Sequence, residues 1–149
     1  MAQGQTDEDG PGNIYCNEIP WDDMKKQYDF VDEFEKLGTL IHSAGEKSRY
    51  DYWNHTFQAM KRTAEIGCLW GSFEIHCKAD SHESALADYK GLLRAVEELE
   101  YHLLMAVESN GDMGVITDIQ QRAVTPILRQ CKDKLTKWYS DLPELKEMW

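Results

Sequence analysis

The sequence has no hydrophobic run approaching the roughly 18 apolar residues that a membrane span needs. Its first residues, MAQGQTDEDGPGN, are acidic and polar, whereas a signal peptide has a basic start and an apolar stretch. Only four prolines and four cysteines occur in 149 residues. These absences predict a soluble, cytoplasmic protein with reduced thiols, no membrane contact and long uninterrupted elements.

Positive charge is also scarce, and the acids are concentrated at one end. The net charge is −11, and residues 1–35 contain ten acids but only two lysines. An acidic chain of this kind is not typical of an autonomous nucleic-acid binder, and it suits a basic partner. We expect residues 1–20 to form an acidic tail, docked or free, and residues 21–149 to form a single helical-bundle domain.

Apolar residues spaced by three and four predict an all-α protein. The four expected helices cover about 21–43, 46–80, 81–110 and 115–142. Short connections make neighbouring helices antiparallel, so we expect an up-down-up-down bundle. Pro126 lies inside the last predicted helix and should kink it.

Residues 67–77, GCLWGSFEIHC, lie on the second predicted helix, which carries two apolar stripes. The first stripe is expected to face the core, with its glycines in a close-packing seam; it contains Trp53, Phe57, Met60, Ala64, Gly67, Cys68, Gly71 and Ile75. The second stripe contains Tyr52, Ala59, Ile66, Trp70, Phe73 and Cys77. Together the stripes are wider than the arc of about 100° that a core-facing helix needs.

The second stripe has two possible explanations. Either the tail or the last helix covers it, or it meets another chain with Trp70 and Phe73 as anchors. In the second case Tyr52 and Ile66 belong to the same partner-binding surface. The acidic side of the first predicted helix would then attract a basic partner, through Asp22, Asp29, Asp32 and Glu33.

No complete catalytic or metal-binding motif occurs. The Glu-x-x-His pairs of di-iron bundles, the H-E-x-x-H of zinc proteases and the glycine-rich phosphate loops are all absent. Cys68 and Cys77 are read as small buried apolar residues. We expect no cofactor, no metal and no catalytic residue.

Arg49-Tyr50-Asp51-Tyr52-Trp53-Asn54-His55 resembles the Arg-x(4–6)-His motif of the helical HEPN ribonucleases. In that family the arginine and histidine act on RNA in a dimer cleft. The resemblance covers seven residues, and here the motif lies early in the chain rather than towards its end. It implies a dimeric ribonuclease as one alternative function.

Basic residues on the last predicted helix suggest another alternative. Residues 116–138 contain five lysines and arginines but two aspartates, and Arg122, Arg129 and Lys132 fall opposite the apolar stripe. A basic strip of this kind has three interpretations. It pairs with an acidic neighbour, it is ordinary solvated surface, or it contacts a nucleic-acid backbone within a larger assembly. The leading hypothesis remains a non-enzymatic subunit, adaptor or inhibitor that binds a protein partner or a second copy.

Overall fold

The structure is a computed structural model that describes residue 14, residues 16–110 and residues 124–143, the last four of the middle range as backbone only. Every regular element in these residues is helical, which confirms the all-α prediction for this part. The elements are the α-helix α1 (Trp21–Met24), the 3-10 helix η1 (Lys25–Tyr28), α2 (Asp29–Lys36), the 3-10 helix η2 (Leu37–Leu40), α3 (Ala44–Lys78), α4 (His82–Asn110) and α6 (Thr125–Leu135). No helix in these ranges has both the length and the apolarity to cross a bilayer.

Local sequence sets both ends of α3. The Ser43 hydroxyl accepts a hydrogen bond from the Glu46 backbone N–H at 3.1 Å, which is an N-cap. At the other end, the Ser81 N–H donates to the His76 carbonyl at 2.9 Å, and Asp80 has a φ of 56°. This Schellman turn joins α3 to α4 in three residues.

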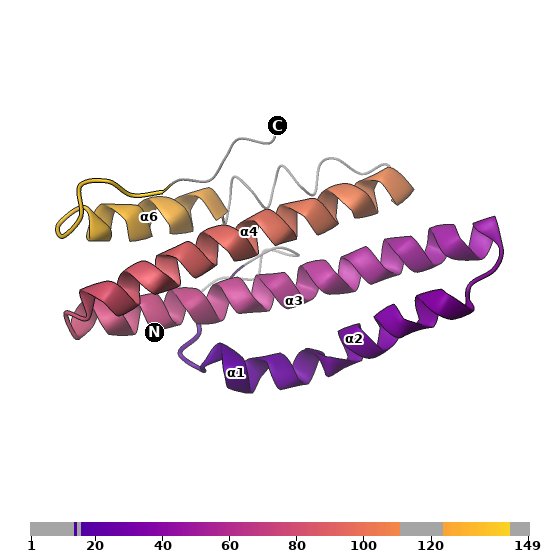
Figure 1. The fold of residues 1–149 in the computed structure, drawn as a ribbon, viewed down its shortest axis with the longest axis horizontal. Coiled ribbons are helices and arrows are strands. Elements are labelled where there is room, and N and C mark those ends of the chain that lie inside the picture. Colours follow the sequence, from indigo (N-terminus) through magenta and orange to yellow (C-terminus); the bar gives the residue numbers. More distant parts are fainter. Residues whose placement is uncertain (1–13, 15, 111–123, 144–149) are drawn as a thin grey trace.

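The core lies along the contact between α3 and α4, which run side by side (Figure 1). Both helices bury residues at steps of seven, the spacing of the coiled-coil repeat, so that side chains from one helix fit between those of the other. The buried residues in this register are Ala59, Ile66 and Phe73 of α3 and Ala85, Leu92 and Leu99 of α4. None of them exposes more than 5% of its surface.

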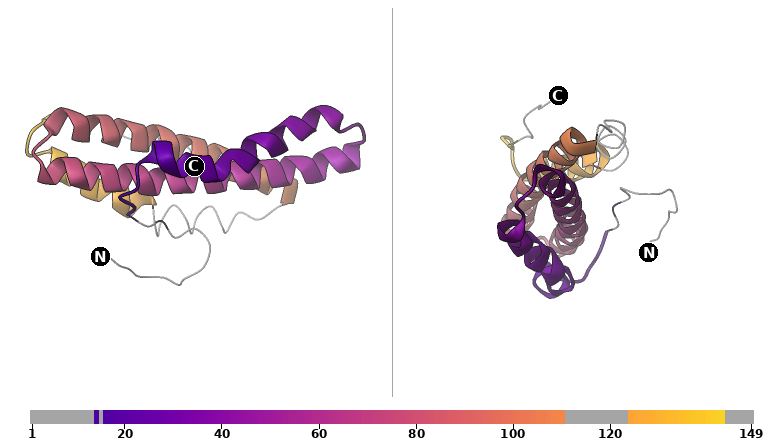
Figure 2. Two further views of the ribbon diagram at one scale, coloured as in Figure 1. Left: turned by 90° about the horizontal axis from the view of Figure 1, so that it is seen from below. Right: turned by 90° about the vertical axis from the view of Figure 1, so that its right-hand side faces the viewer.

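The remaining elements flank this pair on opposite sides (Figures 1 and 2). The segment from α1 to α2 packs on α3, where Val31 is fully buried. α6 packs mainly on α4 and buries Ile127, Cys131 and Leu135 in the shared core. The Tyr89 hydroxyl donates to the Pro143 carbonyl at 2.9 Å, which fastens the chain beyond α6 to α4.

The first predicted helix is interrupted, so the expectation of one helix over 21–43 is wrong. Two 3-10 segments alternate with α1 and α2. Four residues in a 3-10 helix rotate their side chains by about 80° more than four residues in an α-helix. Val31 and Phe34 of α2 are nevertheless buried or partly buried, whereas Leu37, the first residue of η2, is 45% exposed.

The last predicted helix is shorter than expected. α6 ends at Leu135 rather than at Leu142, and Pro126 is its second residue, a position that tolerates proline because no backbone donor is needed there. The part of the predicted helix before residue 124 lies outside the described residues. The kink at Pro126 therefore stays a prediction.

Candidate interaction surface

Three large apolar side chains lie exposed beside one another on α2 and α3. Phe30 of α2 exposes 45% of its surface, and Trp53 and Met60 of α3 expose 47% and 46%. Phe57 connects Phe30 and Trp53, with its ring centroid 5.6 Å from Phe30 and 5.8 Å from Trp53, and Met60 follows Phe57 by three residues on α3. We call these four residues the aromatic face.

The aromatic face follows from how α2 docks on α3. Phe34 stacks on Tyr50 with centroids 5.3 Å apart and meets Phe57 edge-on at 5.1 Å. The Tyr50 hydroxyl also donates to the Glu35 carbonyl. Phe30, one turn earlier on the same side of α2, also meets Phe57 edge-on, and it stays 45% exposed.

Acidic side chains lie on α1 and on α2, the helix that carries Phe30. The predicted partner-binding carboxylates, Asp22, Asp29, Asp32 and Glu33, are all exposed. Asp32 reaches Lys61 of α3 at 3.4 Å, while Asp22 and Glu33 pair with Lys25 and Lys36 inside their own segment. Exposed pairs of this kind contribute about 0–1 kcal/mol each, so these carboxylates can exchange their partners at little cost.

The other predicted anchors are buried within the chain. Ile66 and Phe73 are fully buried between α3 and its neighbours, and Trp70 is half-buried against the same core, with its indole nitrogen enclosed. Tyr52 is half-exposed beside Trp53. The second stripe of α3 is thus covered by α4 and α6, and Ile66 and Phe73 are not accessible to a partner in this conformation.

The first stripe is divided into two halves with different surroundings. Trp53 and Met60, expected in the core, are exposed, whereas Gly67, Cys68 and Gly71 are buried. The segment before α1 occupies the glycine half: the Asn17 N–H donates to the Gly67 carbonyl at 3.0 Å. A Cβ atom on Gly71 would lie 1.9 Å from the Asn17 carbonyl oxygen, so only glycine admits this backbone. The stretch 67–77 therefore contains the surface on which the backbone of residues 16–18 packs, which we call the seat of these residues.

The basic residues of the last helix are distributed differently from the prediction. Arg129 is exposed and Lys132 is half-buried on α6, while Arg122 lies outside the described residues. Lys134, on the same helix, pairs with Glu74 of α3 and so helps to hold α6 in place. No feature of the described part of α6 singles out a phosphate site.

The arginine and the histidine of the HEPN-like motif have different surroundings. Arg49 is exposed, whereas the half-buried His55 faces α4, where its Nδ1 atom lies 2.9 Å from Nδ1 of His102. Burial lowers the pKa of both histidines, that of His102 to about 4. His55 is thus in contact with His102 within its own chain.

A polar cluster across α3 and α4 was missed by the sequence analysis. The Ser72 hydroxyl donates to Asp88 Oδ2 at 2.8 Å, and His76 Nδ1 lies 2.6 Å from the same oxygen. A nucleophilic triad instead needs the serine and the carboxylate on opposite ring nitrogens of the histidine. The cluster is a helix–helix clamp, and the i, i+4 spacing of Ser72 and His76 is its only trace in the sequence.

Thiols and metal ligands do not form a further site in the described ranges. Burial raises the pKa of the Cys16, Cys68, Cys77 and Cys131 thiols, which favours the protonated form of each. No group of three or more histidine, cysteine or acidic side chains there is arranged to hold a metal ion.

No family model matches the chain, and no curated protein or solved structure is detectably similar to it. Any function must therefore be argued from the arrangement of these side chains.

Proposed function

We propose that this chain is a non-enzymatic interaction protein, an up-down-up-down bundle of four helices that docks on a basic protein partner through the aromatic face. The observation that supports this proposal is that Phe30, Trp53 and Met60 are each nearly half exposed on two packed helices, with Phe30 and Trp53 both in ring contact with Phe57. Single exposed apolar residues are ordinary, but adjacent aromatic residues are typical of binding hot spots.

The charge around the aromatic face favours one kind of occupant. Asp29, Asp32 and Glu33 lie on the same short helix as Phe30, and the whole chain carries a net charge of −11. A helix with lysines or arginines beside an apolar stripe would cover the aromatic face and meet these carboxylates at its edge. An amphipathic basic helix is therefore the partner segment that this surface fits best.

The test uses two synthetic amphipathic peptides with the same leucine stripe, one with lysines and one with glutamates on its polar side. We expect the lysine peptide to shift NMR signals of residues 29–33 and 53–60, and to bind more weakly as salt is raised. Replacing Trp53 and Phe30 by Ser should weaken binding at least about tenfold, since hot-spot side chains contribute about 2 kcal/mol or more.

The matched control is Ile75→Ser, which removes an equally exposed apolar side chain of α3 away from the aromatic face. It should leave the affinity unchanged. Equal binding of both peptides, or binding that survives the loss of Trp53 and Phe30, would refute the proposal. Concentration-dependent dimers that dissociate in the double variant would assign the aromatic face to a second copy instead.

A further inference from the structure

Two histidines form a direct contact between the far ends of α3 and α4, away from the connecting turn. The Nδ1 atoms of His55 and His102 are 2.9 Å apart, and the ring centroids are 5.2 Å apart. The difference between the two distances equals two ring radii, so both nitrogens lie on the line that joins the rings. This is the geometry of a nearly linear N–H···N hydrogen bond.

Only one hydrogen atom fits between the two Nδ1 atoms. One imidazole donates from Nδ1 and the other accepts, and this holds when the pair is neutral and when it carries a single positive charge. If both rings are charged, each Nδ1 carries a hydrogen and the two N–H groups point at each other. The contact is then broken by both steric and charge repulsion.

The surroundings do not compensate a double charge. Asp51 and Glu35 favour a charged His55, but Lys47 opposes it, and burial outweighs all three. For His102, burial is again the largest effect, followed by the charges of His55 and Arg62, and Arg62 is itself paired with Glu65 and with Glu98, which lies one turn before His102. Tyr101 meets both rings edge-on.

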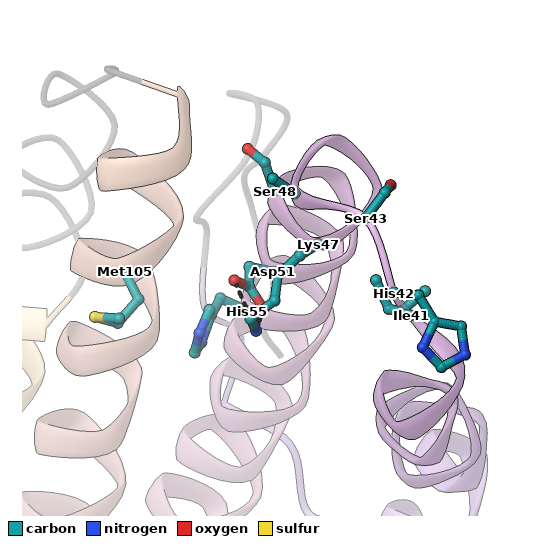
Figure 3. A pocket seen from close by; sticks show the side chains of 9 residues that line it. Ile41, His42, Ser43, Lys47, Ser48, Asp51, His55 and Met105 are labelled. Atoms are coloured by element: carbon teal, nitrogen blue, oxygen red, sulfur yellow. Dashed lines mark hydrogen bonds and ion pairs between the residues drawn. The ribbon is translucent and has the colours of Figure 1, made fainter.

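One ring of the pair, that of His55, lines a neighbouring cavity (Figure 3). The cavity has a volume of about 580 Å³, and His55 lines it together with Asp51, Lys47, His42 and Met105. Lys47 and Asp51 form an ion pair at 3.2 Å within the cavity wall. Its lining therefore supplies one carboxylate and one ammonium group that already neutralise each other.

The opposite end of the α3–α4 pair is held by a different kind of contact. His76 Nδ1 lies 2.6 Å from Asp88 Oδ2 there, so the imidazole faces a carboxylate rather than a second imidazole. The two ends of the hairpin therefore carry histidine contacts of different chemistry.

We propose that His55 and His102 form an acid-sensitive latch, which holds the first half of α3 against the last turns of α4 and opens when both rings are protonated, while the His76–Asp88 clamp keeps the turn end closed. This inference is independent of the aromatic face. It assigns a regulatory role to a histidine pair at a helix–helix contact, a place where apolar side chains are usual.

The latch is tested by NMR on the full chain between pH 7.5 and 3.5. At pH 7.5 we expect a scalar coupling between the two Nδ1 nuclei across the hydrogen bond, with one ring in the Nδ1–H tautomer. As the second proton binds, amides of residues 51–56 and 101–106 should lose hydrogen-exchange protection at the same midpoint, whereas those of residues 72–76 and 86–90 should not.

Two variants separate the latch from general acid effects. His55→Gln keeps a neutral hydrogen-bonding side chain but cannot be charged, so the acid transition should disappear. His42→Gln removes another histidine from the same cavity and should leave the transition intact. The proposal is overturned if both rings titrate independently near pH 6.5, if the local opening persists in His55→Gln, or if no coupling between the nitrogens is found.

Discussion

Replacing Gly71 by Ala tests whether residues 16–18 are seated on α3. An alanine in the middle of a helix is favoured over glycine by about 1 kcal/mol. Here the new methyl group would lie 1.9 Å from the Asn17 oxygen and 2.5 Å from its carbonyl carbon. Both atoms belong to the backbone, so no rotamer change can relieve the clash, and the segment must leave its seat.

The magnitude follows from what the segment loses. Its detachment removes the hydrogen bond from Asn17 to the Gly67 carbonyl, which contributes about 1 kcal/mol. It also exposes Ile14, a partly buried residue whose contact with the core contributes about 1 kcal/mol. Since the helix gains about 1 kcal/mol in return, the free energy of unfolding should fall by only about 1 kcal/mol.

Hydrogen exchange at the Asn17 amide is therefore the sharper measurement. Its protection should be lost in Gly71→Ala, while protection along α3 and α4 persists. Gly91→Ala is the matched control, because its methyl group would lie 3.4 Å from Leu69 Cδ1, an ordinary contact. This control should gain up to about 1 kcal/mol and keep Asn17 protected. A stabilised Gly71→Ala variant with a protected Asn17 amide would refute the reasoning.

Three further predictions concern stability. Asp80→Gly should raise the free energy of unfolding by about 0.5–1 kcal/mol in urea denaturation, because Asp80 is held at a φ of 56°; no gain would mean that its side chain stabilises the turn. Phe73→Ala should cost about 3–5 kcal/mol, whereas Trp53→Ala should cost far less, and equal losses would contradict their assignment to core and surface. Because the pKa of both His55 and His102 is lowered in the fold, the unfolded chain binds more protons below pH 6.5, and stability should decrease as the pH falls from about 6.5 towards 4. A double glutamine variant should lose less stability over that range, and calorimetry against pH would show it.

The long helices were predictable because their signals are local. The Ser43 cap, the periodic apolar residues and the change of pattern near Asp80 all act within a few positions of one another. α3 accordingly begins and ends two residues before the predicted limits. The 3-10 segment η1, which interrupts the first helix, has no comparable local signal, because only the contact with α3 favours the extra rotation of the chain.

The surface was harder to predict than the fold. A helical wheel placed Trp53 and Phe73 correctly on two different stripes, but it contains no information on which stripe another helix covers. The seven-residue register of Ala59, Ile66 and Phe73 was the available signal, because it matches that of Ala85, Leu92 and Leu99. The seat of residues 16–18 was suggested by Gly67 and Gly71, although their occupant has no periodic pattern to identify it.

The three-residue turn between α3 and α4 has a consequence for the order of folding. Closing so short a loop costs little chain entropy, so Phe73 and Ala85 can meet before any distant part of the chain is in place. The contact can then extend stepwise along the seven-residue register, because each step buries further apolar side chains. Residues 16–18 and α6 contact residues much farther away in the sequence, and the surfaces on which they pack exist only once the hairpin has formed. We therefore expect α3 and α4 to form first, and the contacts of residues 16–18 and α6 with them to form last.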